Sequence, residues 1–417
     1  MLGKGEAASQ VQHKNVALFG NFGTGNFGND GSLEAFIELL KRASFAATVT
    51  CICYGDQVVS DNFGVLALPI MSGPSAYFSL LNTFLLKVPN RIVNLWRAYR
   101  IAKRYDLIVV PGTGILDDFK ERWYGTPYQL FIWSACARLA GTPFAFFGIG
   151  AGPIVNAKSR RLMVAAAKLA SYRSYRDVPS KAFLSRHGVN TAHDAIMPDI
   201  AFALTPPDPH AARPRPTNKP TIGIGVMDYD GWKVKDENGP AIYAAYEEKI
   251  TAFAAWAIKQ GFAVRILIGD VHDRVIADKL ANTLRSQFET PGDVLIDPAE
   301  TLSDIMGQMA QTDIVVATRY HNIVCAILAS KPVISIGYAE KNDVLLKSVG
   351  LAEFTQRIED LDLERLKQQF LRLYEHRAEY EPTLVKARDN FRSCIEREFV
   401  VLVEAAGLAK CLEVHPH

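Results

Sequence analysis

The segment from residue 313 to residue 337 restricts the fold more than any other part of the chain. Its sequence, DIVVATRYHNIVCAILASKPVISIG, predicts a buried strand, a turn, a helix and a second strand. Two strands joined through a helix are typical of a parallel sheet, because parallel strands need a long crossover connection. The segment therefore indicates an α/β protein.

Arg319 and His321 lie at the turn, just past the carboxyl end of the first of these strands. Ligands of open α/β sheets bind at that end. The following helix, expected to begin near Asn322, directs its free N–H groups and the positive end of its dipole to the same place. The pattern predicts a site for a small dianion. The alternative is that Arg319 is solvated and that His321 caps the helix.

The chain has 417 residues, more than one hydrophobic core usually organises, so we expect two domains. A segment with six prolines near the middle of the chain excludes helix and interior strand, and we interpret it as a linker. The expected organisation is an N-terminal Rossmann-like domain (1–205), the linker (206–220), a C-terminal Rossmann-like domain (221–380), and a C-terminal helix and tail (381–417).

Both halves of the chain alternate strands with helices, the pattern of a parallel sheet covered on both faces. Strands are expected at 15–20, 107–110, 144–152, 221–226 and 263–268, and helices at 32–41, 159–170, 178–187, 241–260 and 363–404. The last helix is long enough to return to the first domain. Two such domains enclose a cleft, which suits a two-substrate transferase with one substrate on each domain.

Composition excludes several classes of protein. Hydrophobic residues make up 49% and charged residues 22%, as in an ordinary soluble enzyme, and the net charge of +2 is too small to indicate nucleic-acid binding. The polar N-terminal residues do not resemble a signal peptide. Six cysteines lack C-x-x-C spacing, and Cys51 and Cys53 fit one buried strand face better than a metal site. We expect a cytoplasmic protein with reduced thiols.

A glycine-rich turn occupies residues 20–30 (GNFGTGNFGND), after a strand and before a helix. Glycine allows the backbone to approach a ligand closely. The spacing does not match a dinucleotide fingerprint, so a nicotinamide enzyme is not expected.

The turn and four further motifs resemble those of the polysaccharide pyruvyl transferases. Residues 26–30 (NFGND) stand where that family has Asn-x-Gly-Asp-Glu, with Asn29 in place of the usual Asp. Residues 112–118 (GTGILDD) correspond to its glycine triplet, with Thr113 replacing the middle glycine. Residues 148–153 (GIGAGP) match its Gly-x-Gly-x-Gly-Pro motif.

The two remaining motifs contain the cationic residues. Arg176 is followed by an acid at a strand end, and Arg319 and His321 precede an apolar helix and a strand that ends near Tyr338 and Lys341. The five motifs occur in the family's order.

The resemblance implies a glycosyltransferase-B-like fold of two Rossmann-like domains with a cleft between them. It also implies transfer of the pyruvyl group of phosphoenolpyruvate to a sugar of a polysaccharide or lipid-linked oligosaccharide. The product is a pyruvate ketal, and phosphate is released. Phosphoenolpyruvate is then a co-substrate, and we expect no cofactor and no metal.

The reaction that the resemblance implies requires proton transfers and substrate contacts, for which several residues are candidates. His321 is the candidate acid for the methylene carbon, or it only binds phosphate, and Asp118 or Asp30 is the candidate acceptor of a hydroxyl proton. The alternative for both aspartates is capping of a helix N-terminus. The expected substrate-binding residues are Arg319, Arg176, Lys341, Tyr338, Asn322, Gly23, Gly25, Asn26, Gly28, Gly112 and Gly114.

Residues 62–105 contain no acidic residue. The segment carries the basic residues Lys87, Arg91, Arg97, Arg100, Lys103 and Arg104 among the aromatic residues Phe78, Phe84, Trp96 and Tyr99. Such a segment predicts peripheral contact with an anionic membrane through residues 87–104. The alternative is a surface helix whose apolar side packs on the first sheet.

Two other functions stay open at this point. A nucleotide-sugar glycosyltransferase of the same shape needs a carboxylate for a ribose, and Glu340 or Asp343 is the candidate. A non-catalytic carbohydrate- or anion-binding protein also fits the cationic pattern. The sequence predicts no oligomeric state.

Overall fold

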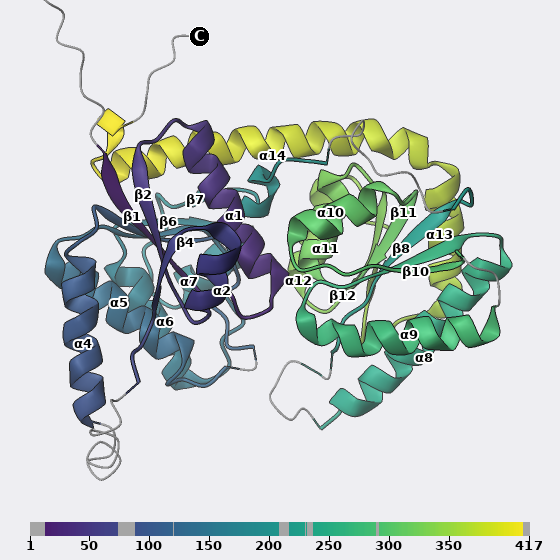
Figure 1. Ribbon diagram of the computed structural model, residues 1–417, viewed down its shortest axis with the longest axis horizontal. Coiled ribbons are helices and arrows are strands. Elements are labelled where there is room, and N and C mark those ends of the chain that lie inside the picture. The colour runs from purple at the N-terminus through teal and green to yellow at the C-terminus, as the bar shows by residue number, and fades with distance from the viewer. Residues whose placement is uncertain are drawn as a thin grey trace, which may run out of the picture.

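The computed structural model describes residues 13–73, 88–119, 121–207, 217–229, 231, 237–288 and 292–411. Much of the predicted linker at 206–220 lies outside these residues. The chain forms two α/β domains that lie side by side (Figure 1). Within the described ranges, no helix combines the length and hydrophobicity that crossing a bilayer requires.

The first domain contains a sheet of seven parallel strands in the order β3-β2-β1-β4-β5-β6-β7. The strands are β1 (Lys14–Gly20), β2 (Ala47–Cys53), β3 (Leu66–Pro69), β4 (Leu107–Pro111), β5 (Phe144–Ile149), β6 (Tyr172–Tyr175) and β7 (Ala195–Ile196). The helices are α1 (Phe27–Arg42), α2 (Asp56–Phe63), α4 (Val88–Ala102), α5 (Thr126–Ala140), α6 (Ala157–Leu169) and α7 (Val178–Arg186), followed by the 3₁₀ turn η1 (Ile200–Ala203).

The second domain contains six parallel strands in the order β10-β9-β8-β11-β12-β13. The strands are β8 (Thr221–Gly225), β9 (Ala263–Leu267), β10 (Val294–Ile296), β11 (Ile314–Ala317), β12 (Val333–Gly337) and β13 (Thr355–Arg357). The helices are α8 (Gly239–Lys259), α9 (Arg274–Gln287), α10 (Leu302–Ala310), α11 (Tyr320–Leu328), α12 (Glu340–Ser348), α13 (Leu363–Glu375) and α14 (Arg377–Ala405), with 3₁₀ turns η2 (Val271–Asp273) and η3 (Ala409–Cys411).

The two sheets share one topology. In each of them the first strand has the second and the fourth as its neighbours, so the chain reverses its winding direction beside that strand. A crevice forms outside the carboxyl ends of the strands at such a switch point, and ligands bind there. The predicted fold class, two Rossmann-like domains with parallel sheets, is confirmed.

The central strands are apolar because helices cover both faces of each sheet. Every residue of β8, β11 and β12 is buried, as expected for short continuous hydrophobic runs in a parallel sheet. The six cysteines all lie in the described part of the chain and form no disulfide there.

The glycine-rich turn after β1 connects the two domains through the main chain. The amide of Phe27 donates a hydrogen bond to the carbonyl of Gly269 at 3.2 Å, and the amide of Val271 donates to the carbonyl of Gly25 at 3.0 Å. Asn26 and Asp270 form an antiparallel bridge between these bonds. The turn is therefore part of the domain interface as well as part of the first sheet's edge.

The largest departures from the predicted bounds occur in three elements. Helix α1 begins at Phe27 rather than Ser32, because the Asn26 side chain caps it by accepting from the amide of Asn29. Strand β5 ends at Ile149, before the glycine-rich loop that follows it. The helix predicted at 363–404 is two helices, α13 and α14, which meet at His376.

Helix α14 runs along one edge of the molecule across both domains (Figure 1). Its Phe399 packs in the first domain, with its ring centroid 5.8 Å from that of Phe36 and 6.1 Å from that of Phe45. Two turns earlier on α14, the ring of Phe391 lies 4.8 Å from that of Phe202. Helix α14 thus completes the hydrophobic core of the first domain.

Candidate active site

Two adjoining pockets lie between the domains at the carboxyl ends of both sheets. We call them the smaller chamber, with a volume of about 180 Å³, and the larger chamber, with a volume of about 340 Å³. Asp117, Arg176, Tyr338 and Lys341 line both, so the chambers form one cleft. The smaller chamber also has Asn21, Asn26, Asn29, Thr113, Gly114, Ile115, Phe119, Glu121, Thr126, Arg319 and His321. The larger chamber also has Gly150, Ala151, Gly152, Pro153, Asp177, Pro179, Ser180, Phe183, Arg186, Ala339 and Glu340.

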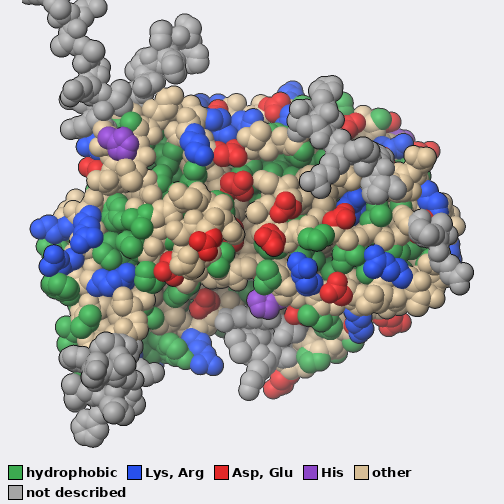
Figure 2. Space-filling view, viewed as in Figure 1, with side chains coloured by type: hydrophobic (Ala, Val, Ile, Leu, Met, Phe, Trp, Pro, Cys, Tyr) green, Lys and Arg blue, Asp and Glu red, His purple; other side chains and the backbone are tan. Residues whose placement is uncertain are grey.

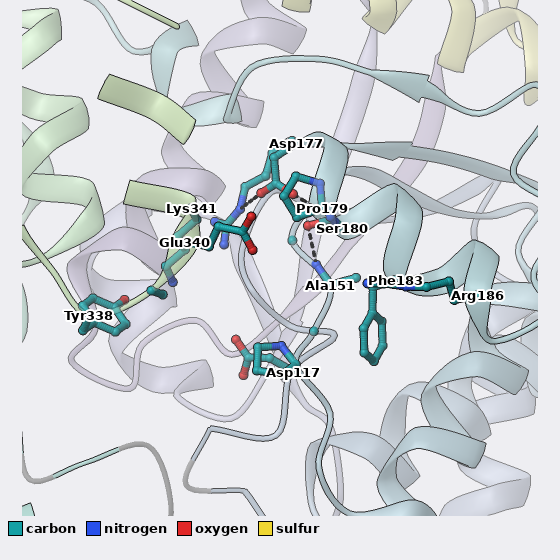
Figure 3. A pocket seen from close by; sticks show the side chains of 15 residues that line it. Asp117, Ala151, Asp177, Pro179, Ser180, Phe183, Arg186, Tyr338, Glu340 and Lys341 are labelled. Atoms are coloured by element: carbon teal, nitrogen blue, oxygen red, sulfur yellow. Dashed lines mark hydrogen bonds and ion pairs between the residues drawn. The ribbon is translucent and has the colours of Figure 1, made fainter. Parts of the chain in front are cut away.

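Figure 3 shows how the two domains meet in the larger chamber. Tyr338, Glu340 and Lys341 come from the loop after β12 and the start of α12, and they face Asp117 and Asp177 of the first domain (Figure 3). A ligand in this chamber therefore contacts both domains at once.

Arg319 lines the smaller chamber but is held by carboxylates of its own domain. Its Nε and Nη2 atoms donate to the two oxygens of Asp273 at 2.9 and 2.6 Å, and Nη2 lies 3.9 Å from Asp270. This edge of the guanidinium is therefore occupied by Asp273 and does not provide the predicted substrate contact. Nη1 forms no hydrogen bond to any described residue and remains available to an anion.

Arg319 is also the N-cap residue of α11, and its side chain makes no capping hydrogen bond. The first amides of α11 therefore lack a capping side chain, which is the arrangement that binds anions at helix N-termini. The predicted helix start near Asn322 is two residues late. Asn322 itself is fully buried against Gly225 and Gly269 and lines neither chamber.

His321 lies under the glycine-rich turn of the first domain. A Cβ atom on Gly28 would lie 1.9 Å from His321 Nδ1, so only glycine permits this approach. Nε2 is buried without a hydrogen-bond partner and lies 3.9 Å from Oδ2 of Asp199. Burial, opposed by Asp199 and reinforced by Arg176, lowers the pKa of His321 to about 4. The imidazole is therefore neutral at pH 7, which argues against its predicted role as the acid.

Arg176 follows β6 and is 4% exposed at its side chain, yet it lines both chambers. Its Nη1 atom donates to Asp199 at 3.1 Å, and its guanidinium carbon lies 4.8 Å from the ring centroid of Tyr320. It packs against Gly150, where a Cβ would lie 2.5 Å from Nη2. The glycine in the loop after β5 thus gives the guanidinium its space.

Lys341 is the second residue of α12, and its ammonium group forms no ion pair with a described residue. Its Nζ atom lies 4.9 Å from the ring centroid of Tyr338 and 5.5 Å from that of Tyr320. Aromatic faces attract a cation without neutralising it as a carboxylate does. Lys341 therefore presents a charge to both chambers.

Asp117 and Asp118 have different environments, and the prediction chose the wrong one for the cleft. Asp118 accepts from the amides of Val155 and Asn156 at 2.9 and 2.7 Å, fixes the loop before α6 and lines neither chamber. Asp117 lines both chambers. Burial, opposed by Lys341, raises its pKa to about 6.

Asp30 supports the glycine-rich turn and does not line the cleft. Its Oδ1 atom accepts from the amide of Gly23 at 2.7 Å, and burial raises its pKa to about 6. Gly23 has a φ of 69° and packs against Gly55, where a Cβ would meet the Gly55 carbonyl oxygen at 2.4 Å. Neither Asp30, expected to be catalytic, nor Gly23, expected to contact the ligand, therefore lines either chamber.

The other predicted polar and glycine positions divide between the cleft and the domain interface. Asn26 lines the smaller chamber, and its side-chain Nδ2 atom donates a hydrogen bond to Oδ2 of Asp270 at 3.1 Å. Gly114 lines the smaller chamber as well. Gly25 packs against Val271, and Gly112 packs against Ile200, so these two lie behind the surface of the cleft.

The prediction missed the acids that surround the cations: Asp117, Asp199, Asp270 and Asp273. A signal existed for Asp270, which lies directly beyond the predicted strand at 263–268, at the same kind of strand end as Arg319. Glu121 was missed because it comes from a loop whose direction the sequence does not reveal. Ser180 and Phe183 were missed because the sequence does not reveal which side of α7 faces the cleft.

The part of the chain that matches one known protein family includes most of the residues that line this cleft. The model of the polysaccharide pyruvyl transferase family matches residues 26–340, from the N-cap of α1 to the start of α12. The chain belongs to the polysaccharide pyruvyl transferase family. Membership assigns this pyruvyl transferase a polysaccharide or sugar acceptor. No protein of curated function matches the chain.

Solved structures similar to this pyruvyl transferase define its fold more closely. S. aureus MnaA in complex with UDP is 12% identical, with a TM-score of 0.60, and covers 95% of this chain and 97% of its own. The UDP-GlcNAc 2-epimerase of Methanocaldococcus jannaschii is 13% identical, with a TM-score of 0.58, and the match covers 94% of this chain and 100% of the epimerase. A UDP-forming trehalose-phosphate synthase of Burkholderia vietnamiensis is 11% identical, with a TM-score of 0.56, and the match covers 97% of this chain and 99% of the synthase. These likenesses confirm the glycosyltransferase-B-like fold.

Proposed function

We propose that the cleft transfers the pyruvyl group of phosphoenolpyruvate to a sugar, as a ketal, and releases phosphate. The observation that carries the proposal is Lys341, whose ammonium group forms no ion pair with a described residue, in a cleft that Arg176 and Arg319 also line. Phosphoenolpyruvate carries a phosphate and a carboxylate, so its site needs several cations and N–H donors. The reaction itself needs no cofactor.

The smaller chamber suits the donor. Its walls include the start of α11, where amides without a capping side chain and Nη1 of Arg319 can receive the phosphate. Lys341 and Nη2 of Arg176 are then left for the carboxylate. His321 stays neutral and contributes a ring nitrogen as a hydrogen-bond partner, and a bound dianion would raise its pKa.

The larger chamber suits the sugar acceptor. The rings of Phe183 and Tyr338 offer apolar surface to the C–H face of a sugar, and the carboxylates of Asp177 and Glu340 offer acceptors for hydroxyl groups. Because this chamber shares Asp117 with the smaller one, an acceptor hydroxyl can approach the donor beside that carboxyl group.

Ketal formation requires proton transfers that balance. A proton adds to the methylene carbon, the central carbon becomes electrophilic, and an acceptor hydroxyl adds there and loses its proton. The bond from the central carbon to the phosphate oxygen then breaks, and a second hydroxyl closes the ring and loses its proton. We assign the proton transfer at the methylene carbon to Asp117, because a carboxyl group with a pKa of about 6 exchanges protons near neutral pH.

The test is incubation with phosphoenolpyruvate and a panel of free, polymeric and lipid-linked glycosides, read by mass spectrometry and by phosphate release. The expected product is heavier than its acceptor by one pyruvate minus one water, with one phosphate released per product. Phosphate release without a modified glycoside, or turnover that continues when phosphoenolpyruvate is omitted, would contradict the proposal.

A nucleotide-sugar transferase is the second candidate, favoured by one observation. Structural neighbours of this chain are named for UDP or UDP-sugars, and Glu340 lines the larger chamber, where it can accept from a ribose. Asp343 is less suited, since it lies 3.6 Å from Arg357 and lines neither chamber. Nucleotide release from a sugar nucleotide distinguishes this activity. A non-catalytic binding protein would show weaker ligand binding for Arg319→Ala and His321→Ala, with no turnover by the unsubstituted protein.

A further inference from the structure

Helix α4 exposes an apolar stripe at the outer edge of the first domain. Val88, Ile92 and Trp96 follow one another at four-residue spacing, which places them on one face, and they are 49%, 60% and 60% exposed. Val93 and Leu95 add 55% and 44% exposed side chains beside them. Scattered exposed hydrophobic residues need no explanation, but a contiguous group marks an interaction surface.

Only the C-terminal half of α4 contributes buried side chains to the domain. The buried residues of the helix are Ala98, Ile101 and Ala102, and none of those from 88 to 97 is buried. The interpretation of α4 as a helix whose apolar side covers the first sheet therefore holds for its last turns alone. The apolar side chains of its first turns remain exposed.

Basic residues continue the same face beyond the apolar stripe. Arg100 is four residues past Trp96, and its guanidinium carbon lies 4.7 Å from the Trp96 ring centroid. Arg100, Lys103 and Arg104 are exposed, and the sequence has no acidic residue from 62 to 105. Blue and green side chains gather along this flank of the first domain, at the left in Figure 2.

We propose that this α4 surface docks on an anionic phospholipid bilayer. Ile92 and Trp96 enter the interfacial layer, where aromatic and aliphatic side chains are stable, and the exposed cations contact lipid phosphates. The positive charge of the α4 surface favours an anionic bilayer over a second copy of the chain. Two copies paired through α4 would bring the same cations together without an acid to neutralise them, whereas an anionic bilayer is complementary.

The α4 surface continues toward the cleft. A groove of about 230 Å³ between α4 and α5 is lined by Leu95, Trp123 and Tyr124 among others. Glu121 and Thr126, on either side of those two aromatic residues in the chain, line the smaller chamber of the cleft. Docking through α4 therefore holds one wall of the cleft close to the membrane surface.

The experiment is co-sedimentation of the full chain with phosphatidylcholine vesicles that contain or lack phosphatidylglycerol. We expect binding to the anionic vesicles only. Each basic residue near a charged surface contributes about fivefold to partitioning. Replacing Arg100, Lys103 and Arg104 by glutamate is therefore expected to weaken binding by about a hundredfold or more. Ile92→Ser with Trp96→Ser is expected to weaken it as well.

The matched control replaces three exposed lysines elsewhere in the chain by glutamate, and so changes the net charge by the same amount as the α4 triple variant. These lysines are Lys259, Lys347 and Lys386. It is expected to bind anionic vesicles far more tightly than the α4 triple variant, and the thermal unfolding of both variants is compared with that of the unsubstituted chain. Equal losses in the two triple variants, or binding that does not depend on phosphatidylglycerol, overturn the proposal. So does self-association in solution that the α4 variants abolish while vesicles are not bound. The measurement uses no substrate and does not depend on the proposed reaction.

Discussion

His321 Nε2 lies 3.9 Å from Oδ2 of Asp199, beyond hydrogen-bond distance, and burial keeps the imidazole neutral. The pKa of His321 in the folded chain is about 4, below its ordinary value of 6.5. As the pH falls through 6.5, His321 of the unfolded chain binds a proton, whereas His321 of the folded chain does not. The neutral, buried imidazole therefore stabilises the folded chain fully above pH 6.5, and this contribution to the free energy of unfolding falls by up to about 3 kcal/mol as the pH approaches 4.

We therefore expect His321→Gln to flatten the pH dependence of the unfolding free energy between about pH 6.5 and 4. Denaturant titrations at several pH values measure it, with His193→Gln as the control, because His193 is exposed. If His321→Gln retains the full slope while folding normally, the imidazole is charged in the native protein and its described setting is wrong.

Asp117→Asn is expected to lower kcat by about 10²- to 10⁴-fold with little change in phosphoenolpyruvate affinity, because it removes the proposed proton carrier. It is also expected to remove the alkaline limb of the pH–rate profile, at or above about pH 6. Transfer of solvent deuterium to the pyruvyl methyl group reports the same step.

Asp118→Asn is the neighbouring control. It disturbs two backbone hydrogen bonds, so we expect a loss of about 1–2 kcal/mol of stability with turnover within a few-fold of normal. The opposite pattern, in which Asp118→Asn is inactive and Asp117→Asn is active, would return the role to Asp118.

Lys341→Met is expected to weaken phosphoenolpyruvate binding about ten- to hundredfold, since it removes a cation of the cleft that forms no ion pair with a described residue. Titration calorimetry with phosphoenolpyruvate alone measures this without any acceptor. Lys347→Met, on the same helix but outside both chambers, should bind normally. Equal affinities in the two variants would place the donor elsewhere.

Gly28→Ala is expected to destabilise the chain by about 1–3 kcal/mol and to abolish turnover, because its Cβ would lie 1.9 Å from His321 Nδ1. Gly307→Ala, a helical glycine with open space around it, is expected to raise stability by up to about 1 kcal/mol. Thermal and denaturant unfolding compare the two. A neutral Gly28→Ala would mean that the domains are not held this closely in solution.

The alternation of strands and helices was predictable from the sequence because the central strands are short apolar runs, most of them bounded by glycine or proline. The positions of Arg319 and Arg176 were predictable for a related reason, since a parallel sheet brings its strand ends together. The partners of those arginines were not. Asp273 and Asp199 reach them from elements far away in the chain, and no local pattern encodes such a pairing. Nor does periodicity reveal which of two adjacent loop residues, Asp117 or Asp118, turns toward the cleft.

Phe399 packs beside Phe36 and Phe45, and this contact has a consequence for the order of folding. A ribosome releases the first sheet long before it has translated α14. Until then the nascent N-terminal half exposes rings that only the end of the chain can cover. Separate expression of residues 1–205 should thus yield an aggregating fragment, which co-expressed α14 peptide rescues.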